Sequence, residues 1–128
     1  MATFSLNKQE RIKSNRLTTS LFAEGQTLFK HPFTVRYQLI TKRDSSHKFA
    51  VSVPKRNFRK AVDRNHLKRL IREAYRTNKP LLPLEYLEDQ SKTLVIMFIY
   101  IGKQKIEFPL IDKAIKKILT QLNKEISN

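Results

Sequence analysis

Cysteine is absent from this sequence, and its absence excludes two ways of holding a small domain together. A chain without thiols forms neither disulfide bonds nor a thiolate zinc site, and this composition fits a reducing compartment. The chain has 128 residues and 40% apolar composition, which is enough to bury a core of its own. We therefore predict one domain over residues 1–128 and a cytoplasmic location.

Long apolar runs and glycine are also scarce. Residues 1–15 mix charged and polar side chains and lack the apolar segment of a secretory signal. The longest apolar run, residues 94–101, has eight residues, whereas a membrane-spanning helix needs roughly 20. Gly25 and Gly102 are the only glycines, and there is no internal repeat or Gly/Ser linker. We expect a soluble, single compact unit.

Acidic residues are too few to balance the basic ones. The chain has 26 Lys and Arg against 11 Asp and Glu, a net charge of +15. This surplus predicts a polyanionic partner, because cations that neutralise phosphates release condensed counterions. Nucleic acid is the first candidate, an anionic membrane surface is the second, and a basic surface without a partner is the third. The excess is concentrated in residues 55–76, which hold nine basic and two acidic side chains.

The first half of the chain predicts one helix followed by strands. Residues 15–23 place apolar side chains, among them Leu17, one turn apart and stop before Gly25, as a helix ended by glycine does. Residues 33–40 and 48–53 alternate apolar and polar side chains, which predicts two half-buried strands joined by the polar loop 41–47. A weaker pattern at residues 27–29 indicates a third, shorter strand.

The second half predicts two helices around one strand. A helix is expected to begin near Asp63 and to stop at Asn78 and Pro80. Residues 81–90 are expected to be mostly loop with room for one acidic turn, and residues 94–101 a strand covered on both faces. A last amphipathic helix should follow Pro109. This order indicates an α+β or α/β fold with helices layered on a sheet.

The helix predicted after Asp63 has an apolar and a basic side. At about 100° per residue, the apolar side chains at positions 67, 70, 71 and 74 form one stripe. The other side, an arc of roughly 140°, carries Arg64, Asn65, Lys68, Arg69, Arg72 and Arg76. Cations four residues apart lie about 6 Å from one another along the axis, near the spacing of phosphates in a nucleic-acid strand. A helix that needed only solubility would interleave Glu at i+4.

Cations also precede this helix, in residues 52–60, where arginine can grip phosphate bidentately. An ordinary solvated helix face and an ordinary exposed loop remain the alternatives to phosphate binding for these two segments.

Residues 60–74 resemble a known signature. The protein subunit of bacterial ribonuclease P carries Ala-Val-x-Arg-Asn-x-x-Lys-Arg-x-x-Arg-Glu on its RNR helix, and residues 61–73 match every named position. Residues 49–56 are similar to the strand that precedes this helix in the family. The resemblance implies a compact α-β-β-β-α-β-α sandwich, similar to the second domain of ribosomal protein S5, with a left-handed β-α-β crossover. His66 departs from the Arg-Asn-Arg trio and replaces the permanent charge of an arginine by an imidazole.

The resemblance also implies a function. The chain would be the RNA-binding subunit of the ribonucleoprotein endonuclease that removes the 5′ leader of precursor tRNA, as a monomer in a 1:1 complex. The RNA subunit would perform the hydrolysis with Mg²⁺, and the protein, holding no metal, cofactor or catalytic residue, would lower the magnesium requirement. The residues implied for binding the RNA subunit are Arg59, Lys60, Arg64, Asn65, Lys68, Arg69, Arg72 and Arg76.

The first helix and the sheet would form a cleft for the single-stranded leader by the same resemblance. Stacking on aromatic side chains tolerates any leader sequence, and the alternative for each aromatic residue is a place in the core, since Phe at helical or strand spacing is more often buried. Phe22 on the helix would face Phe33 and Tyr37 on a strand, and the implied leader-binding residues are Phe22, Phe33, Tyr37, Ser52, Lys55 and Arg56.

Other functions receive less support from the residues. A nuclease acting by itself needs a general acid and base or a carboxylate cluster that holds metal, but His31 and His47 are expected on loops and His66 on a helix, without a paired acidic motif. A DNA-reading helix would need a second helix a short turn before it, and a membrane-lying helix would carry Trp or Phe on its apolar side. A ribosomal or duplex-RNA-binding module remains the alternative, and the spaced signature is what argues against it.

Overall fold

The computed structural model describes residues 15–41 and 45–127. Residues 1–14, predicted to carry no secretory signal, residues 42–44 of the predicted polar loop, and the side chains of Asn15 and Leu17 lie outside this description. The elements in chain order are α1 (Asn15–Glu24), β1 (Gln26–Lys30), β2 (Phe33–Thr41), β3 (His47–Ser52), α2 (Ala61–Asn78), the 3₁₀ turn η2 (Lys79–Leu81), α3 (Leu84–Asp89), β4 (Lys92–Tyr100) and α4 (Phe108–Ser127). The predicted α-β-β-β-α-β-α order is confirmed, with η2 and α3 added before β4.

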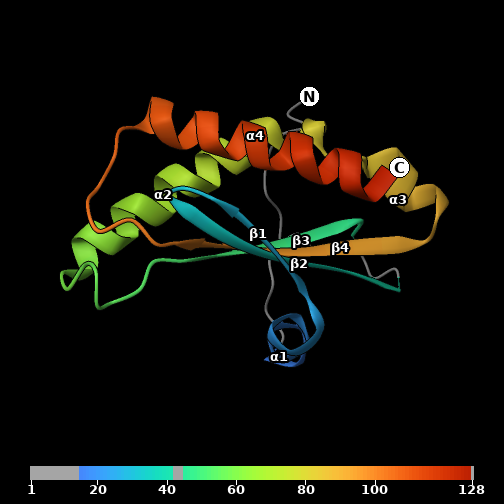
Figure 1. The fold of residues 1–128 in the computed structure, drawn as a ribbon, viewed down its shortest axis with the longest axis horizontal. Helices are drawn as coiled ribbons and strands as arrows, with labels where there is room; N and C mark the ends of the chain where they lie inside the picture. The colour runs from blue at the N-terminus through green and yellow to red at the C-terminus, as the bar shows by residue number, and fades with distance from the viewer. Residues whose placement is uncertain (1–14, 42–44, 128) are drawn as a thin grey trace.

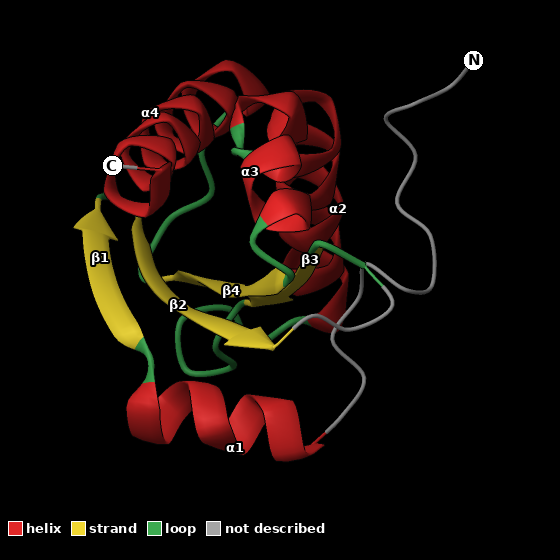
Figure 2. Cartoon of the chain, turned by 90° about the vertical axis from the view of Figure 1, so that its right-hand side faces the viewer, coloured by secondary structure: helices red, strands yellow, loops and turns green. Residues whose placement is uncertain are grey.

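The four strands form one mixed sheet in the order β1-β2-β4-β3. β1, β2 and β4 pair antiparallel, and β3 pairs parallel with β4. Parallel neighbours need a crossover connection, and α2 supplies it. Figure 1 shows α2 and α4 on one face of the sheet and α1 on the other, and the turned view in Figure 2 agrees. The architecture is therefore the α+β sandwich that the resemblance implied.

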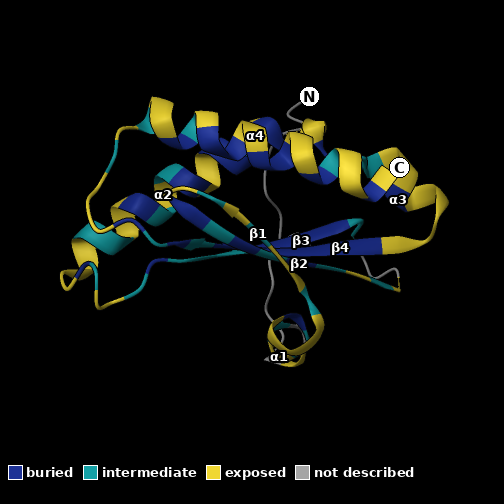
Figure 3. Cartoon of the chain, viewed as in Figure 1, coloured by how far each residue is buried: buried dark blue, intermediate teal, exposed yellow. Residues whose placement is uncertain are grey.

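β4 separates two cores, because successive side chains of a strand point to opposite faces. Ile96 and Phe98 join the main core beneath α2 and α4, whereas Val95 and Met97 pack with Leu21 of α1. The prediction of a strand covered on both faces is confirmed. In Figure 3, the buried residues of α2 and α4 lie on the sides that face the sheet.

α2 contributes one core residue that the helical pattern did not assign. Tyr75 is fully buried, and its ring stacks on Phe49 with 4.2 Å between ring centroids. Its hydroxyl lies 2.8 Å from Nδ1 of His47, which is 2% exposed. The prediction that His47 belongs to a loop is wrong, because this polar contact lets the imidazole be buried at the start of β3.

Several element boundaries differ from the prediction for reasons of local chemistry. Residues 84–89 form α3, which anchors in the core through the fully buried Leu87. The prolines and acidic residues of this segment are typical of a loop, which is why the sequence did not predict a helix. Pro83 lies just before the helix, where its missing N–H breaks no helical hydrogen bond. α4 likewise begins at Phe108 and accommodates Pro109 in its first turn. No helix among the described residues is long and apolar enough to cross a membrane.

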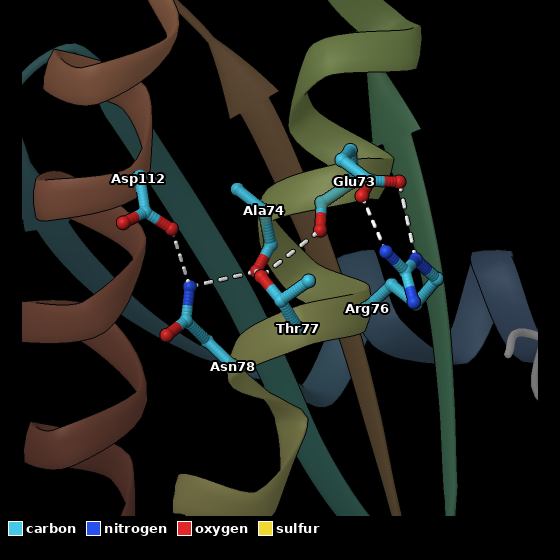
Figure 4. A network of polar contacts seen from close by, with 6 residues as sticks. All are labelled: Glu73, Ala74, Arg76, Thr77, Asn78 and Asp112. Carbon is cyan, nitrogen blue, oxygen red and sulfur yellow. Dashed lines mark hydrogen bonds and ion pairs between the residues drawn. The ribbon is translucent and has the colours of Figure 1, made fainter. Parts of the chain in front are cut away.

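The end of α2 is fastened to α4 by Asn78. The Asn78 side-chain amide donates to the Ala74 carbonyl at 2.8 Å and to Asp112 Oδ1 at 2.7 Å, as Figure 4 shows. Asn78 itself is buried. The residue predicted to stop the helix therefore also fixes the position of α2 beside α4.

Candidate nucleic-acid interface

The candidate interface begins with the basic face of α2, the six residues Arg64, Asn65, Lys68, Arg69, Arg72 and Arg76. The buried side of the helix consists of Leu67, Ile71, Ala74, Tyr75 and Asn78. Because Tyr75 extends the buried side toward the basic face, Arg64 and Lys68 are half-buried, while Asn65, Arg69 and Arg72 are exposed. The basic face is thus a flank of the helix whose far edge is open to solvent.

This face points away from α4. Asn78 contacts Asp112 of α4. Asp63 forms an ion pair with Lys105, which precedes α4, with 3.1 Å between Oδ1 and Nζ. At 100° per residue, Arg69 and Arg72 lie roughly 180° around the helix from these two contacts. α4 therefore does not cover the most exposed cations of the basic face.

Two arginines of the basic face have intramolecular partners. Arg64 Nη1 donates to the carbonyl oxygens of Phe58 and Arg59, each at 2.8 Å. Arg76 is paired with Glu73 through two hydrogen bonds (Figure 4). This hydrogen bonding lowers the pKa of the Glu73 carboxyl and raises the pKa of Arg76. Arg64 therefore holds the preceding loop, and Arg76 carries a partly neutralised charge.

The remaining cations of this face have no such compensation. Within the described part of the chain, Lys68 and Arg72 form no ion pair or hydrogen bond, and Arg69 meets only the His66 ring, with 3.4 Å between Nη2 and Nδ1. Like charges on one helix face repel each other. A ligand that brings phosphates to this face would relieve the repulsion.

The loop before α2 is anchored by buried apolar side chains and exposes basic ones. Val53 and Phe58 are buried, and Phe58 packs against Tyr100 with 5.9 Å between ring centroids. A turn in which the Asn57 N–H donates to the Pro54 carbonyl closes the loop. Its four basic side chains are all exposed: Lys55, Arg56, Arg59 and Lys60. The structure therefore brings Arg59 and Lys60 next to the start of the basic face.

α1 docks on the opposite face of the sheet mainly through contacts of Leu21 and Arg36. Leu21 is fully buried against Val95 and Met97. Arg36 of β2 reaches the end of α1, where its Nη2 donates to the carbonyls of Leu21 at 3.0 Å and Phe22 at 2.6 Å. Cations stabilise the carboxyl ends of helices, where carbonyls lack helical partners. Arg36 is therefore the charged attachment of α1, and Ser20 Oγ adds a hydrogen bond to Gln38 Oε1 at 3.3 Å.

Gly25 and Phe22 complete this attachment. A Cβ at position 25 would lie 2.3 Å from the Leu21 carbonyl, so only glycine fits where α1 turns directly into β1. The Arg36 guanidinium carbon lies 5.6 Å from the centre of the Phe22 ring, which is 50% exposed. The ring of Phe22 is thus presented to solvent beside a cation, an arrangement suited to stacking on a base.

Phe33 and Tyr37 do not face Phe22, and their assignment to the leader cleft is wrong. Phe33 is fully buried in the main core, on the α2 and α4 side of the sheet. Tyr37 is 6% exposed on the same side, and its hydroxyl donates to Glu125 Oε1 at 2.5 Å. Burial, with this hydrogen bond, raises the pKa of Tyr37 to about 12. The alternating residues of β2 place these two rings in the core and Thr34, Arg36 and Gln38 on the face of α1.

An open strip of the sheet runs from α1 to the basic loop. Thr34 of β2, Ile99 of β4 and Ser52 of β3 are neighbours in register, and all three are partly exposed. Arg36 lies two residues from Thr34 on the same face, and Lys55 follows Ser52 by three residues. A single nucleic-acid strand that passes Phe22 and follows this strip would therefore reach Ser52, Lys55 and Arg56.

Arg36 and Thr34, which the structure places on the α1 face, were not among the residues predicted for this cleft. Their signal was present, because the alternation that assigns Phe33 and Tyr37 to one face assigns these residues to the other.

Among residues 15–41 and 45–127, no three His, Asp or Glu side chains gather so that they could hold a metal ion.

Known proteins are similar to this chain in sequence. The family model for ribonuclease P matches residues 6–123. The ribonuclease P protein component of Porphyromonas gingivalis is 35% identical over 122 residues, which cover 94% of this chain and 88% of that protein. The Thermotoga maritima component is 37% identical over 81 residues, which cover 63% of this chain and 67% of that protein.

Solved structures agree with the sequence comparisons. The ribonuclease P protein from Thermotoga maritima superposes with a TM-score of 0.69 at 25% identity, covering 88% of this chain and 96% of that one. A Staphylococcus aureus RNase P protein mutant has the same fold, with a TM-score of 0.69 at 21% identity and coverage of 89% and 88%. The match extends over most of the chain and includes the helix that carries the basic face, and the protein belongs to the ribonuclease P protein component family.

Proposed function

We propose that this protein is the subunit of ribonuclease P that binds the catalytic RNA and the 5′ leader of precursor tRNA. The observation that carries the proposal is the basic face of α2, where Lys68, Arg69 and Arg72 match the signature of the family and no carboxylate among the described residues pairs with them. The reaction that the complex performs is endonucleolytic removal of the leader.

The RNA subunit is the ligand of the basic face and of the loop before it. Lys68, Arg69 and Arg72 supply charge and bidentate donors to phosphates. Arg64 acts indirectly, because its bonds to the Phe58 and Arg59 carbonyls hold the loop that presents its own cations. Pre-organised cations lose little conformational entropy when they bind.

The leader follows the open strip on the face of α1. Phe22 offers a stacking surface, Arg36 and Lys55 offer charge, and Thr34 and Ser52 offer hydroxyls along the strip. Stacking and phosphate contacts do not depend on base identity. This chemistry suits a leader whose sequence varies from one tRNA to another.

We assign the hydrolysis that removes the leader to the RNA subunit and its Mg²⁺. In the protein, His31 lies in the β1–β2 turn, His47 is buried against Tyr75, and His66 lies on α2, so these groups do not converge as a general acid and base must. The protein lowers the magnesium requirement by neutralising phosphates where the RNA and leader meet. The proposal includes a 1:1 complex that acts in the cytoplasm, where precursor tRNA is matured.

The test is leader cleavage at low magnesium. The full chain is mixed with a bacterial ribonuclease P RNA and a precursor tRNA at a magnesium concentration where the RNA alone cleaves slowly. We expect the protein to raise the rate of leader removal, and the variant carrying Arg69→Ala and Arg72→Ala to raise it much less. A rate equal to that of the RNA alone would contradict the proposal.

A further inference from the structure

A second basic region lies where the turn between β1 and β2 meets α4. A hollow of about 390 Å³ opens there, and its main lining residues are Lys30, Pro32, Ile106, Leu110, Lys113 and Lys117. The lysines come from two elements far apart in sequence, β1 and α4. The fold therefore gathers charge at a place that the pattern along the chain does not reveal.

The charge in this hollow is uncompensated. No carboxylate lines it, and within the described residues Lys30, Lys113 and Lys117 form no ion pair or hydrogen bond. Other lysines nearby are paired: Lys116 lies 3.2 Å from Asp112, and Lys105 lies 3.1 Å from Asp63. The contrast points to an anionic ligand for the three lysines of the hollow.

The apolar part of the hollow narrows the class of ligand. Leu110 is 55% exposed and Ile106 is partly exposed, so the ammonium groups surround an apolar surface. A ribose or base can cover such a surface while its phosphates reach the lysines, which RNA supplies together. Leu110 is the one large apolar side chain exposed on α4 among the described residues, too little for a helix lying in a membrane surface.

The hollow lies at the same end of the helical layer as the first turn of α2, on a different side from the basic face. The segment 101–107 links them: the Ile101 N–H donates to the Pro32 carbonyl at 2.8 Å, and Lys105 pairs with Asp63 in the first turn of α2. Figure 1 shows the β1–β2 turn and the starts of α2 and α4 at the same end of the molecule. One RNA can therefore meet both regions around this end of the helical layer.

We propose that the hollow lined by Lys30, Lys113 and Lys117 is a second contact site for the RNA subunit of ribonuclease P. This inference rests on the proposed function, because its ligand is the same RNA that the basic face of α2 is proposed to bind. The three lysines contact phosphates of one RNA segment, and Leu110 and Ile106 contact its sugar or base.

The first test compares two charge-matched variants of the full chain. Lys113→Gln with Lys117→Gln removes two charges from the hollow, and Lys92→Gln with Lys124→Gln removes two exposed charges outside it. The dissociation constant for ribonuclease P RNA is measured across a salt series. Since the slope falls by about 0.7 to 0.9 per lost phosphate contact, the hollow variant should lower the salt slope by about one to two, and the control should leave it nearly unchanged. Equal slopes for the two variants would overturn the proposal.

The variant carrying Arg69→Gln and Arg72→Gln separates this inference from the function on which it rests. If the α2 variant loses affinity and the hollow variant does not, the second site is refuted and the proposed function stands. If neither loses affinity, the RNA-binding role of α2 fails as well. Circular dichroism melting curves that match the unsubstituted protein exclude misfolding as the cause of a loss.

The second test locates the RNA directly. Because the chain has no cysteine, Lys113→Cys creates a unique attachment point for an iron chelate that cleaves nearby RNA. In the assembled complex with precursor tRNA, we expect cuts in the RNA subunit. Cuts confined to the precursor, or no cuts in either RNA, would overturn the assignment of the hollow to the RNA subunit.

Discussion

Replacing Arg36 tests whether one guanidinium fastens α1 to the sheet. Arg36→Ala removes its hydrogen bonds to the Leu21 and Phe22 carbonyls, the bond from Nη1 to Thr27 Oγ1 at 2.8 Å, and the contact with the Phe22 ring. The remaining attachments are the hydrogen bond from Ser20 Oγ to Gln38 Oε1 at 3.3 Å and Leu21, whose burial stabilises docking by about 1.5–3 kcal/mol. The substitution should therefore act on α1 far more than on the main core.

Two opposing contributions set the change in the free energy of α1 docking when Arg36 is replaced by Ala. Hydrogen bonds of a charged group contribute about 1.5–3 kcal/mol each when buried, and the partial exposure of Arg36 reduces this. Arg36 Nε is buried without a partner, so its removal also relieves a desolvation penalty of about 1–2 kcal/mol. The net loss is roughly 2 kcal/mol of α1 docking, equivalent to a rise of about 30-fold in the undocked population.

Amide hydrogen exchange measures this population. We expect the amides of α1 to exchange about 30-fold faster in Arg36→Ala, and the amides of β4 to keep their protection. Arg36→Lys is the matched control: it keeps the charge but loses the planar fork, so it should restore protection only in part. Unchanged exchange in α1 for Arg36→Ala would refute the role of the guanidinium.

Three further predictions follow from the positions of single side chains. Phe22→Ala should leave the melting temperature nearly unchanged and weaken binding of a leader-bearing precursor but not of leaderless tRNA, whereas Phe33→Ala should cost about 3–5 kcal/mol of unfolding free energy, because its ring fills the core; a stable Phe33→Ala protein with weakened leader binding would reverse the assignment. The raised pKa of Tyr37, about 12 in the folded state, contributes stability that is present below pH 10 and lost between pH 10 and about 12; Tyr37→Phe should flatten this part of the curve of unfolding free energy against pH, and an unchanged curve would contradict the buried hydrogen bond to Glu125. Leu87→Ala should cost about 2–5 kcal/mol in urea unfolding if α3 belongs to the core, and a loss below about 1 kcal/mol would show that α3 is peripheral.

The sequence was sufficient to predict the order of elements and the basic face of α2. Both depend on local periodicity, and α2 has a strong pattern because its apolar and basic residues occupy separate sides. The alternation of residues 33–40 also identified two faces of β2. It could not tell which face meets α1, since helices cover both sides of this sheet, and the aromatic residues were placed on the wrong one.

Contacts between distant residues account for what the sequence left undetermined. Arg36 becomes an attachment for α1 only because the chain reverses at Gly25, which carries the helix end back over β2. His47 is buried only because Tyr75, 28 positions later, supplies a partner for its ring. The hollow beside Lys113 likewise exists only once the β1–β2 turn meets α4.

The salt dependence of RNA binding by α2 variants tests the central claim most directly. We expect Arg69→Ala with Arg72→Ala to weaken binding of the full chain to ribonuclease P RNA and to reduce the salt slope by the equivalent of about two phosphate contacts. Arg64→Ala should lower the affinity with a smaller change in slope, because that side chain holds the loop through the Phe58 and Arg59 carbonyls. An unchanged slope for the double variant would contradict the claim that the basic face of α2 binds the RNA.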